Sequence, residues 1–189
     1  MKSHKKNLTE EVMNSTNTIL TALLMVVSFK TQALDVEKAL APTIAQAQKW
    51  AADAKVVAAV KDGNANNATK YKDMNQDKWK VASIMDAAVK DFTKNAAASF
   101  LKTSKSAEVT EVFVNAKDGT KVAFLAKTSG WSHAGKPKHD VPMTGKVWVG
   151  KVETDASTGL QQVQFGVPVM DEGKVIGSLV VGVDAAKLK

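Results

Sequence analysis

The sequence predicts an α+β fold, in which a five-stranded antiparallel sheet carries a long N-terminal helix and a second helix packed on it. Between residues 109 and 184, runs rich in Val, Ile and Leu alternate with polar turns, as in antiparallel strands. Between residues 35 and 102, apolar residues recur at steps of three and four, as in amphipathic helices. The chain has 189 residues, 44% of them hydrophobic and 24% charged, which suits one soluble domain.

Two hairpins and a middle strand account for the predicted sheet. The closing segment 163–183 contains two β-type runs around the polar break Asp171-Glu-Gly173, which predicts a hairpin with a short Gly-containing turn. Pro168 cannot donate a ladder hydrogen bond, so we expect it to mark a strand end. An earlier hairpin is predicted from 111–115 and 120–125, and a single strand from 145–152. Joined in sequence, these runs predict a five-strand meander with one apolar face.

Two helices are predicted before the sheet. The first spans 35–61 and ends at Asp62-Gly-Asn64, a typical stop signal, with a polar loop over 64–75. The second spans 76–102 and should bury one apolar stripe, with Trp79 beside it. That stripe consists of Val81, Met85, Val89, Phe92, Ala96 and Phe100.

Residues 1–33 have the pattern of a secretory signal peptide. Lys2, Lys5 and Lys6 precede the apolar run 19–27, and Thr31-Gln-Ala33 provides a small-x-small cleavage site. The run is shorter than the ~20 residues that span a bilayer. We expect export to the periplasm with cleavage after Ala33, or retention of the segment as an inner-membrane anchor. An amphipathic N-terminal helix, or a start at Met13, are the alternatives.

The charged residues and the lack of cysteine exclude several functions. The formal net charge is +7 and all basic residues are Lys. Sequence-specific DNA reading commonly uses bidentate Arg, so no nucleic-acid partner is expected. Without cysteine there is no disulfide framework and no thiol chemistry. No cofactor is expected, and no nucleophile or phosphate-binding motif is present, so the chain is not expected to be an enzyme.

Unusual residues are concentrated in the non-periodic segment 126–144, between the two hairpins. A long loop in a compact domain is usually functional, and Trp with convergent polar groups is typical of a small-molecule pocket. The alternative is a lid in which Trp131 plugs the core. His133, His139 and Asp140 could bind a metal or support hydrolysis, but their spacing is a weak signal.

The chain resembles a single Cache domain, also called a PDC or PAS-like extracytoplasmic sensor. The resemblance rests on the order of the segments 56–64, Trp79, 112–119, 127–129, 155–157 and 165–183. It implies a long helix on one face of the sheet and a small-molecule pocket between the other face and segment 126–144. Family members often continue into a membrane helix and an output domain, whereas this chain stops at Lys189.

We therefore expect a domain, residues 34–189, that binds a small molecule and lacks an output domain of its own. Lys and His in segment 126–144 favour an anionic or carboxylate ligand over a cationic amine. The expected ligand contacts are Trp131, Lys127, His133, Lys138, His139, Trp148 and Gln164. Expected partners are a membrane-bound signalling protein and a second copy paired through the N-terminal helix. A ligand-free structural or interaction module of the cell envelope is the competing hypothesis.

Overall fold

A computed structural model describes residues 36–155 and 159–188. The predicted signal segment 1–33 lies outside the described residues. From Leu40 onward the chain forms one compact unit, which contains the sheet and all the sites discussed below. No helix in the described ranges is long and apolar enough to cross a membrane.

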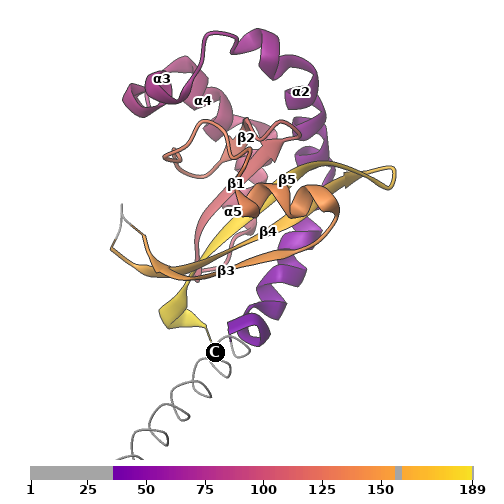
Figure 1. Cartoon of the computed structure of the whole chain (residues 1–189), viewed down its shortest axis with the longest axis vertical. Coiled ribbons are helices and arrows are strands. Elements are labelled where there is room, and N and C mark those ends of the chain that lie inside the picture. The colour runs from indigo at the N-terminus through magenta and orange to yellow at the C-terminus, as the bar shows by residue number, and fades with distance from the viewer. Residues whose placement is uncertain (1–35, 156–158, 189) are drawn as a thin grey trace, which may run out of the picture. The chain divides into compact units, whose positions relative to one another are not determined.

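The sheet has five antiparallel strands, which confirms the predicted fold class (Figure 1). They are β1 Val109–Ala116, β2 Lys121–Phe124, β3 Trp148–Thr154, β4 Gln161–Asp171 and β5 Lys174–Asp184. The spatial order is β2-β1-β5-β4-β3, so the meander was wrong, because β5 lies between β1 and β4. A meander would leave β5 at an edge, whereas its residues from Gly177 to Val183 are buried and suit the sheet centre.

Both ends of the β4–β5 hairpin follow from local chemistry. Glu172 and Gly173 have φ of 47° and 77°, so they form a tight two-residue turn with both central residues left-handed. Pro168 does not end its strand as expected; it lies inside β4, opposite Ser178. It is tolerated because β3 pairs with β4 only as far as Gly166, and Pro168 lies beyond that point.

A bulge in β2 decides which way two adjacent side chains face. Val114 pairs with Ala123, but Asn115 pairs with Lys121, so Val122 is the extra residue. Val122 therefore packs toward the helices, close to Gly63. Lys121 is turned to the opposite face, where its amine meets the side chain of Asn115.

The N-terminal helical region consists of two helices. Residues 36–51 are helical, and α2 Ala54–Lys70 begins after Asp53, whose carboxylate accepts from the Lys55 amide. The predicted stop at Gly63 was wrong, because Gly63 is buried inside α2 against the sheet. Beyond it, Asn64 and Asn67 form hydrogen bonds to the hairpin joining β1 and β2. The Asn67 amide donates to the Lys121 carbonyl at 3.0 Å, and Asn64 accepts from the Lys117 amide at 2.7 Å.

Three short helices replace the predicted second helix. They are α3 Gln76–Val81, α4 Ala87–Lys94 and α5 Ala96–Ser104. The stripe is correct for Val89 and Phe92, which are buried, and wrong for Val81 and Met85, which are exposed. The reason is the irregular connection 82–86 and the sharp junction at Asn95, which ends α4 and caps α5.

The two faces of the sheet are covered differently. Figure 1 shows α2 and α5 on one side, and segment 126–144 on the other with α6 Pro137–Asp140 in front of the sheet. The short helix η1 Pro142–Thr144 follows α6, and η2 Ala185–Lys187 follows β5. Glu111, Phe113 and Asn115 face segment 126–144, because they alternate with Val112 and Val114 along β1. The polar residues of β1 thus face the side of the sheet that segment 126–144 covers.

Candidate functional site

A pocket of 260 Å³ lies between the sheet and segment 126–144, where the resemblance to sensor domains implied one. Strands β1, β3 and β4 supply its floor, and the segment supplies one wall. Lining residues are Glu111, Phe113, Thr128, Ser129, His133, Lys138, Trp148, Gly150, Lys151, Glu153, Thr154, Asp155, Gln162 and Gln164. Four expected contacts are therefore brought together here: His133, Lys138, Trp148 and Gln164.

Lys138 is held in place by the close packing of α6 on β4. A Cβ at Gly166 would lie 2.5 Å from the Lys138 carbonyl oxygen, so only glycine allows this approach. Lys138 Nζ donates to Gln164 Oε1 at 2.7 Å, and Gln164 Nε2 donates to Glu111 Oε2 at 2.7 Å. Gln164 thus separates the ammonium from the carboxylate, and both residues line the pocket.

Burial shifts the pKa of both charged groups toward the neutral form. It lowers the pKa of Lys138, against the opposing attraction of Glu111. It raises the pKa of Glu111, although Lys138 and the Gln164 hydrogen bond oppose this. Within the described ranges, no carboxylate lies within ion-pair distance of Lys138. Glu111 and Glu153 attract the ammonium without forming an ion pair with it.

His133 forms part of the wall beside Phe113. Its ring stacks on the Phe113 ring, with centroids 4.7 Å apart and planes 19° apart. Its Nδ1 contacts Nζ of Lys121, which is fully buried behind it. Burial, followed by the nearby charge of Lys121, lowers the pKa of His133 to about 2. The imidazole is therefore neutral over the physiological pH range.

His139 lies behind the pocket, paired with a serine. Ser178 Oγ lies 2.8 Å from His139 Nδ1, and His139 Nε2 lies 3.3 Å from the Lys117 carbonyl oxygen. A Ser–His pair suggests a nucleophile and its base, but both residues are buried and neither lines the pocket. The other partner of the ring is the Lys117 carbonyl, where a catalytic triad would have a carboxylate. The pair joins α6 to β5.

Trp131 and Lys127 do not line the pocket. Trp131 packs in an aromatic cluster with Tyr71, Trp79 and Phe92, at centroid distances of 5.6, 5.3 and 5.8 Å. Lys127 lies over the outside of this cluster, with Nζ 5.1 Å from the Trp79 ring centroid. Trp131 thus plugs the core, as in the lid alternative. Direct ligand contact by either residue remains an untested prediction.

The three candidate metal ligands of segment 126–144 are each used differently. His133 meets Lys121, His139 meets Ser178, and Asp140 Oδ1 accepts from the Gly135 amide at 3.2 Å. Over the described part of the chain, no group of three or more acidic or His side chains is arranged to hold a metal ion.

Sequence reasoning missed Glu111, Lys121 and Asn115, which lie on or behind the pocket floor. Their signal was present in part: Glu111, Phe113 and Asn115 alternate with valines, which places two polar groups on one face. Lys121 begins an otherwise apolar strand, and a lysine there reads as a solvated strand end. Only the tertiary structure shows that its amine is buried.

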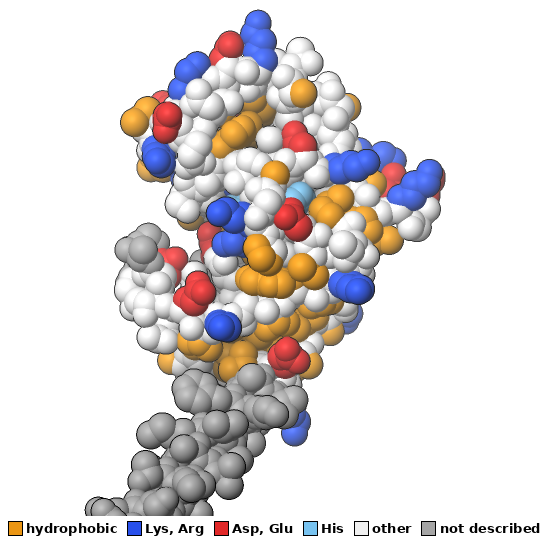
Figure 2. Space-filling model, viewed as in Figure 1, with side chains coloured by type: hydrophobic (Ala, Val, Ile, Leu, Met, Phe, Trp, Pro, Cys, Tyr) orange, Lys and Arg blue, Asp and Glu red, His pale blue; other side chains and the backbone are white. Residues whose placement is uncertain are grey.

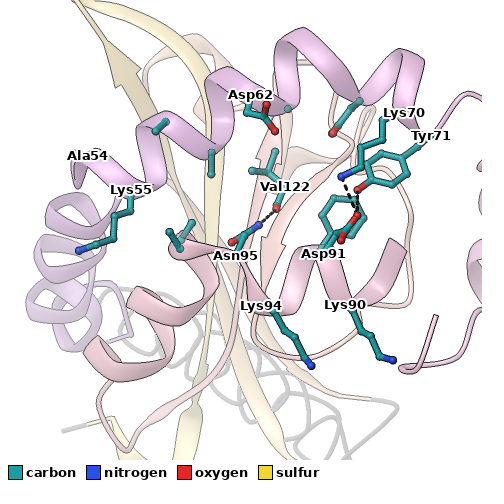
Figure 3. Close-up of a pocket in the computed structure, with 17 residues that line it drawn as sticks. Ala54, Lys55, Asp62, Lys70, Tyr71, Lys90, Asp91, Lys94, Asn95 and Val122 are labelled. Atoms are coloured by element: carbon teal, nitrogen blue, oxygen red, sulfur yellow. Dashed lines mark hydrogen bonds and ion pairs between the residues drawn. The ribbon is translucent and has the colours of Figure 1, made fainter. Parts of the chain in front are cut away.

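A larger hollow of 740 Å³ lies on the helix side of the sheet, between α2 and the helices α4 and α5 (Figure 3). Its floor contains Val122 and Asn95, whose amide donates to the Val122 carbonyl at 2.8 Å. Small alanines and exposed lysines form much of the wall. At one end, Lys70 pairs with Asp91 at 2.9 Å. This hollow is larger, but the buried charged and titratable groups surround the sheet-side pocket, which we take as the candidate site.

The surface on the α6 side carries basic and acidic side chains interspersed, rather than a continuous field of one sign (Figure 2). Extended basic surfaces are the electrostatic signature of nucleic-acid binding. The lysines visible on this face are instead distributed singly among acidic and apolar groups.

No protein-family model matches the chain, and no curated protein matches it either. Among solved structures, the ligand-binding domain of the Pseudomonas aeruginosa PAO1 amino acid chemoreceptor PctC, in complex with GABA, is 14% identical, with a TM-score of 0.43. That alignment covers 69% of this chain and 58% of the PctC ligand-binding domain in that structure. The ligand-binding domain of the Campylobacter jejuni chemoreceptor Tlp3, in complex with 4-methylisoleucine, is 14% identical, with a TM-score of 0.42, covering 80% and 61%.

The sensor domain of the V. cholerae histidine kinase DctB is 16% identical, with a TM-score of 0.36, covering 82% of this chain and 57% of that one. The chain thus spans about three fifths of the length of these three structures. At these TM-scores, the similarity does not assign a function.

Proposed function

We propose that this chain is a Cache-type sensor domain that binds a small carboxylate metabolite in the sheet-side pocket, without turning it over. One observation carries the proposal. The pocket lining includes the ammonium of Lys138, partly desolvated and without a carboxylate at ion-pair distance among the described residues. A ligand carboxylate placed there regains the electrostatic energy that burial removes.

The pocket also limits the size and charge of the ligand. Its 260 Å³ lies just below the ~300–1,000 Å³ typical of small-molecule sites. Glu153 and Asp155 also line the pocket. A second negative charge on the ligand would meet these acids. The proposed ligand is therefore a small monocarboxylate, with its charged end toward Lys138 and its remainder against Trp148.

A thermal-shift screen tests this proposal, because a ligand that binds only the folded state raises the unfolding temperature by mass action. The panel contains monocarboxylates, dicarboxylates and alkyl amines at matched concentrations. We expect monocarboxylates to stabilise the wild type most, and Lys138→Met to lose at least tenfold in affinity by calorimetry. Lys90→Met is the matched control, since Lys90 lines the helix-side hollow instead.

Two results would overturn the assignment. Tight binding of a cationic amine would reverse the ligand's charge and point to Glu111 as the principal contact. Loss of binding in Lys90→Met but not in Lys138→Met would move the site to the other face of the sheet.

A ligand-free interaction module is the competing proposal, and one observation favours it. The α3–α4 connection exposes Val81, Ile84 and Met85, at 84%, 70% and 66% of their surface. Neighbouring exposed apolar side chains are common at protein interfaces. If no compound in the panel stabilises the wild type, while Val81→Ser with Met85→Ser abolishes capture of a partner, this function replaces the first.

We further propose that the domain works outside the cytoplasm and reports to a membrane-bound signalling protein. Support comes from the basic and apolar pattern of residues 1–33. Fractionation and N-terminal sequencing of the expressed full chain test this. Mature protein starting at Leu34 in the periplasm supports export with cleavage, and an uncleaved cytoplasmic protein contradicts it.

A further inference from the structure

Lys121 is a fully buried amine without an acidic partner in the described part of the chain. Its Nζ lies 2.8 Å from Asn115 Oδ1 and 4.2 Å from the centre of the Phe113 ring, and it contacts His133 Nδ1. Buried lysines are rarely left without a charged partner, because desolvation favours the neutral amine. This arrangement therefore calls for an explanation beyond packing.

The contacts fit one consistent set of hydrogen-bond directions, in which the Lys121 amine donates twice. Asn115 Nδ2 donates to Ser178 Oγ at 2.9 Å, so Asn115 Oδ1 is left to accept from Lys121. The lysine amine then donates a second N–H to His133 Nδ1. An imidazole nitrogen that accepts carries no proton, so the proton of the neutral ring sits on Nε2.

Nε2 of His133 is the open end of this chain of hydrogen bonds. It has no hydrogen-bond partner among residues 36–155 and 159–188, although His133 is only 7% exposed. This nitrogen is not fully buried. In those ranges, the only side-chain nitrogen or oxygen that is both fully buried and without a hydrogen-bond partner is the indole nitrogen of Trp50. His133 is one of the residues that line the sheet-side pocket, so its free nitrogen is a candidate donor to a ligand bound there.

We propose that Lys121 is a positioning residue of the ligand site: it holds His133 in the Nε2–H tautomer, so that the ring donates to an anionic ligand. Lys121 does not touch the ligand itself. The assignment of a ligand to Nε2 rests on the proposed function, whereas the tautomer is a property of the free protein. Conversion of Lys121 to a residue without a donor would release the ring.

Anion binding is coupled to proton uptake at this pair. Burial lowers the pKa of Lys121 well below its ordinary value, and burial together with Lys121 lowers that of His133. The other charges acting on the pair are Glu111 on β1, Lys138 and His139 on α6, and Lys136 just before α6. An anion beside Nε2 adds a negative charge, which raises both pKa values. Binding takes up protons where the pH lies near the raised pKa values, and over that range carboxylate affinity rises as the pH falls.

The first arm of the test is nitrogen-15 NMR of the histidine side chains in the ligand-free protein at pH 7. We expect the Nε2–H signature for His133 in the wild type and in Lys138→Met. In Lys121→Met, which keeps an unbranched side chain but is one atom shorter and has no donor, the ring should show mixed tautomers. An Nδ1–H tautomer in the wild type, or an unchanged signature in Lys121→Met, would overturn the proposal. The wild-type spectrum alone is decisive should the variant not fold.

The second arm is calorimetry with acetate as the probe, in two buffers of different ionisation enthalpy. We expect the wild type to take up protons when it binds acetate. In Lys121→Met we expect this uptake to disappear and the affinity for acetate to fall at least tenfold. Acetate binding with no proton uptake contradicts the coupling while leaving the proposed function intact. If neither acetate nor any other carboxylate binds, the proposed function is wrong. The NMR experiment still tests the Lys121–His133 contact in that case.

Discussion

Gly63 of α2 lies so close to Val122 of β2 that a Cβ added at Gly63 would stand 2.7 Å from Val122 Cγ2. Real Cβ atoms do not approach another carbon so closely. Val122 is buried and branched, so it cannot swing away. The glycine therefore sets how near the helix lies to the sheet, even though a glycine inside a helix is itself unfavourable.

Gly63→Ala should destabilise the protein by about 1–3 kcal/mol, the usual cost of overpacking. This is opposite in sign to the helix propensity, which favours Ala over Gly by about 1 kcal/mol. Urea unfolding measures the difference. The control is the same substitution in a Val122→Ala background, where the clash is absent and the propensity gain should return. Stabilisation by Gly63→Ala alone would show that the helix moves away at little cost.

Glu172→Asn in the β4–β5 turn should raise the free energy of unfolding by several tenths to about 1 kcal/mol. Glu172 has a φ of 47°, in the left-handed region that Asn tolerates better than other side chains. Glu172→Ala is the control and should give no gain, since alanine has the same backbone penalty. Equal effects of Asn and Ala would mean that side-chain charge, not backbone conformation, matters here.

Trp131→Ala should cost about 3–5 kcal/mol, as expected for truncating a buried aromatic side chain. Trp131 contacts Tyr71, Trp79 and Phe92 within one cluster. Met85→Ala, on the exposed α3–α4 connection, is the control and should stay within about 0.5 kcal/mol of the wild type. If Trp131→Ala keeps wild-type stability but loses ligand-induced stabilisation, then Trp131 is the ligand contact expected from the sequence.

Stability should fall as the pH drops below about 6.5, the ordinary pKa of histidine. His133 has a folded pKa of about 2, so the unfolded chain binds a proton in this range that the folded protein does not. The expected slope is about 1.4 kcal/mol per pH unit for one such proton. Burial also lowers the pKa of His139, which adds to the slope. Urea unfolding between pH 7 and pH 4.5 measures it.

His133→Gln should reduce the slope by about 1.4 kcal/mol per pH unit, the contribution of one proton, because it removes one of the groups whose pKa is lowered by folding. Glu111 acts in the opposite direction. Its folded pKa is raised, so its contribution to stability is present at low pH and lost as the pH rises through that folded pKa. The difference between wild type and His133→Gln cancels the Glu111 contribution. Identical slopes for the two proteins would mean that His133 titrates normally.

Local patterns were sufficient to locate the strands and the last hairpin turn, but not the order of the strands or the course of the helices. The turn at Glu172–Gly173 and the alternation in β1 depend on near neighbours, and both were visible in the sequence. By contrast, Gly63 has the composition of a helix stop, and only its contact with Val122 explains why the helix continues. The break after residue 81 likewise depends on Trp79 docking its indole onto the Thr128 carbonyl at 2.7 Å, 49 residues away.

The site shows the same division. His133, Lys138, Trp148 and Gln164 could be proposed because segment 126–144 and its neighbouring strands have unusual compositions. Lys121 could not. Counting back from Phe124, strict alternation places Lys121 on the helix side, and only the bulge at Val122 turns it toward His133. The one extra residue in β2 therefore determines that the Lys121 amine lies on the side of the sheet where His133 is.

The Asn67 side chain holds the Lys121 carbonyl on one side of β2, and the Lys121 amine reaches the pocket wall on the other. One residue, Lys121, therefore contacts both α2, through its carbonyl, and the pocket wall, through its amine. Any shift of this residue acts directly on the Asn67 hydrogen bond, with no intervening side chain.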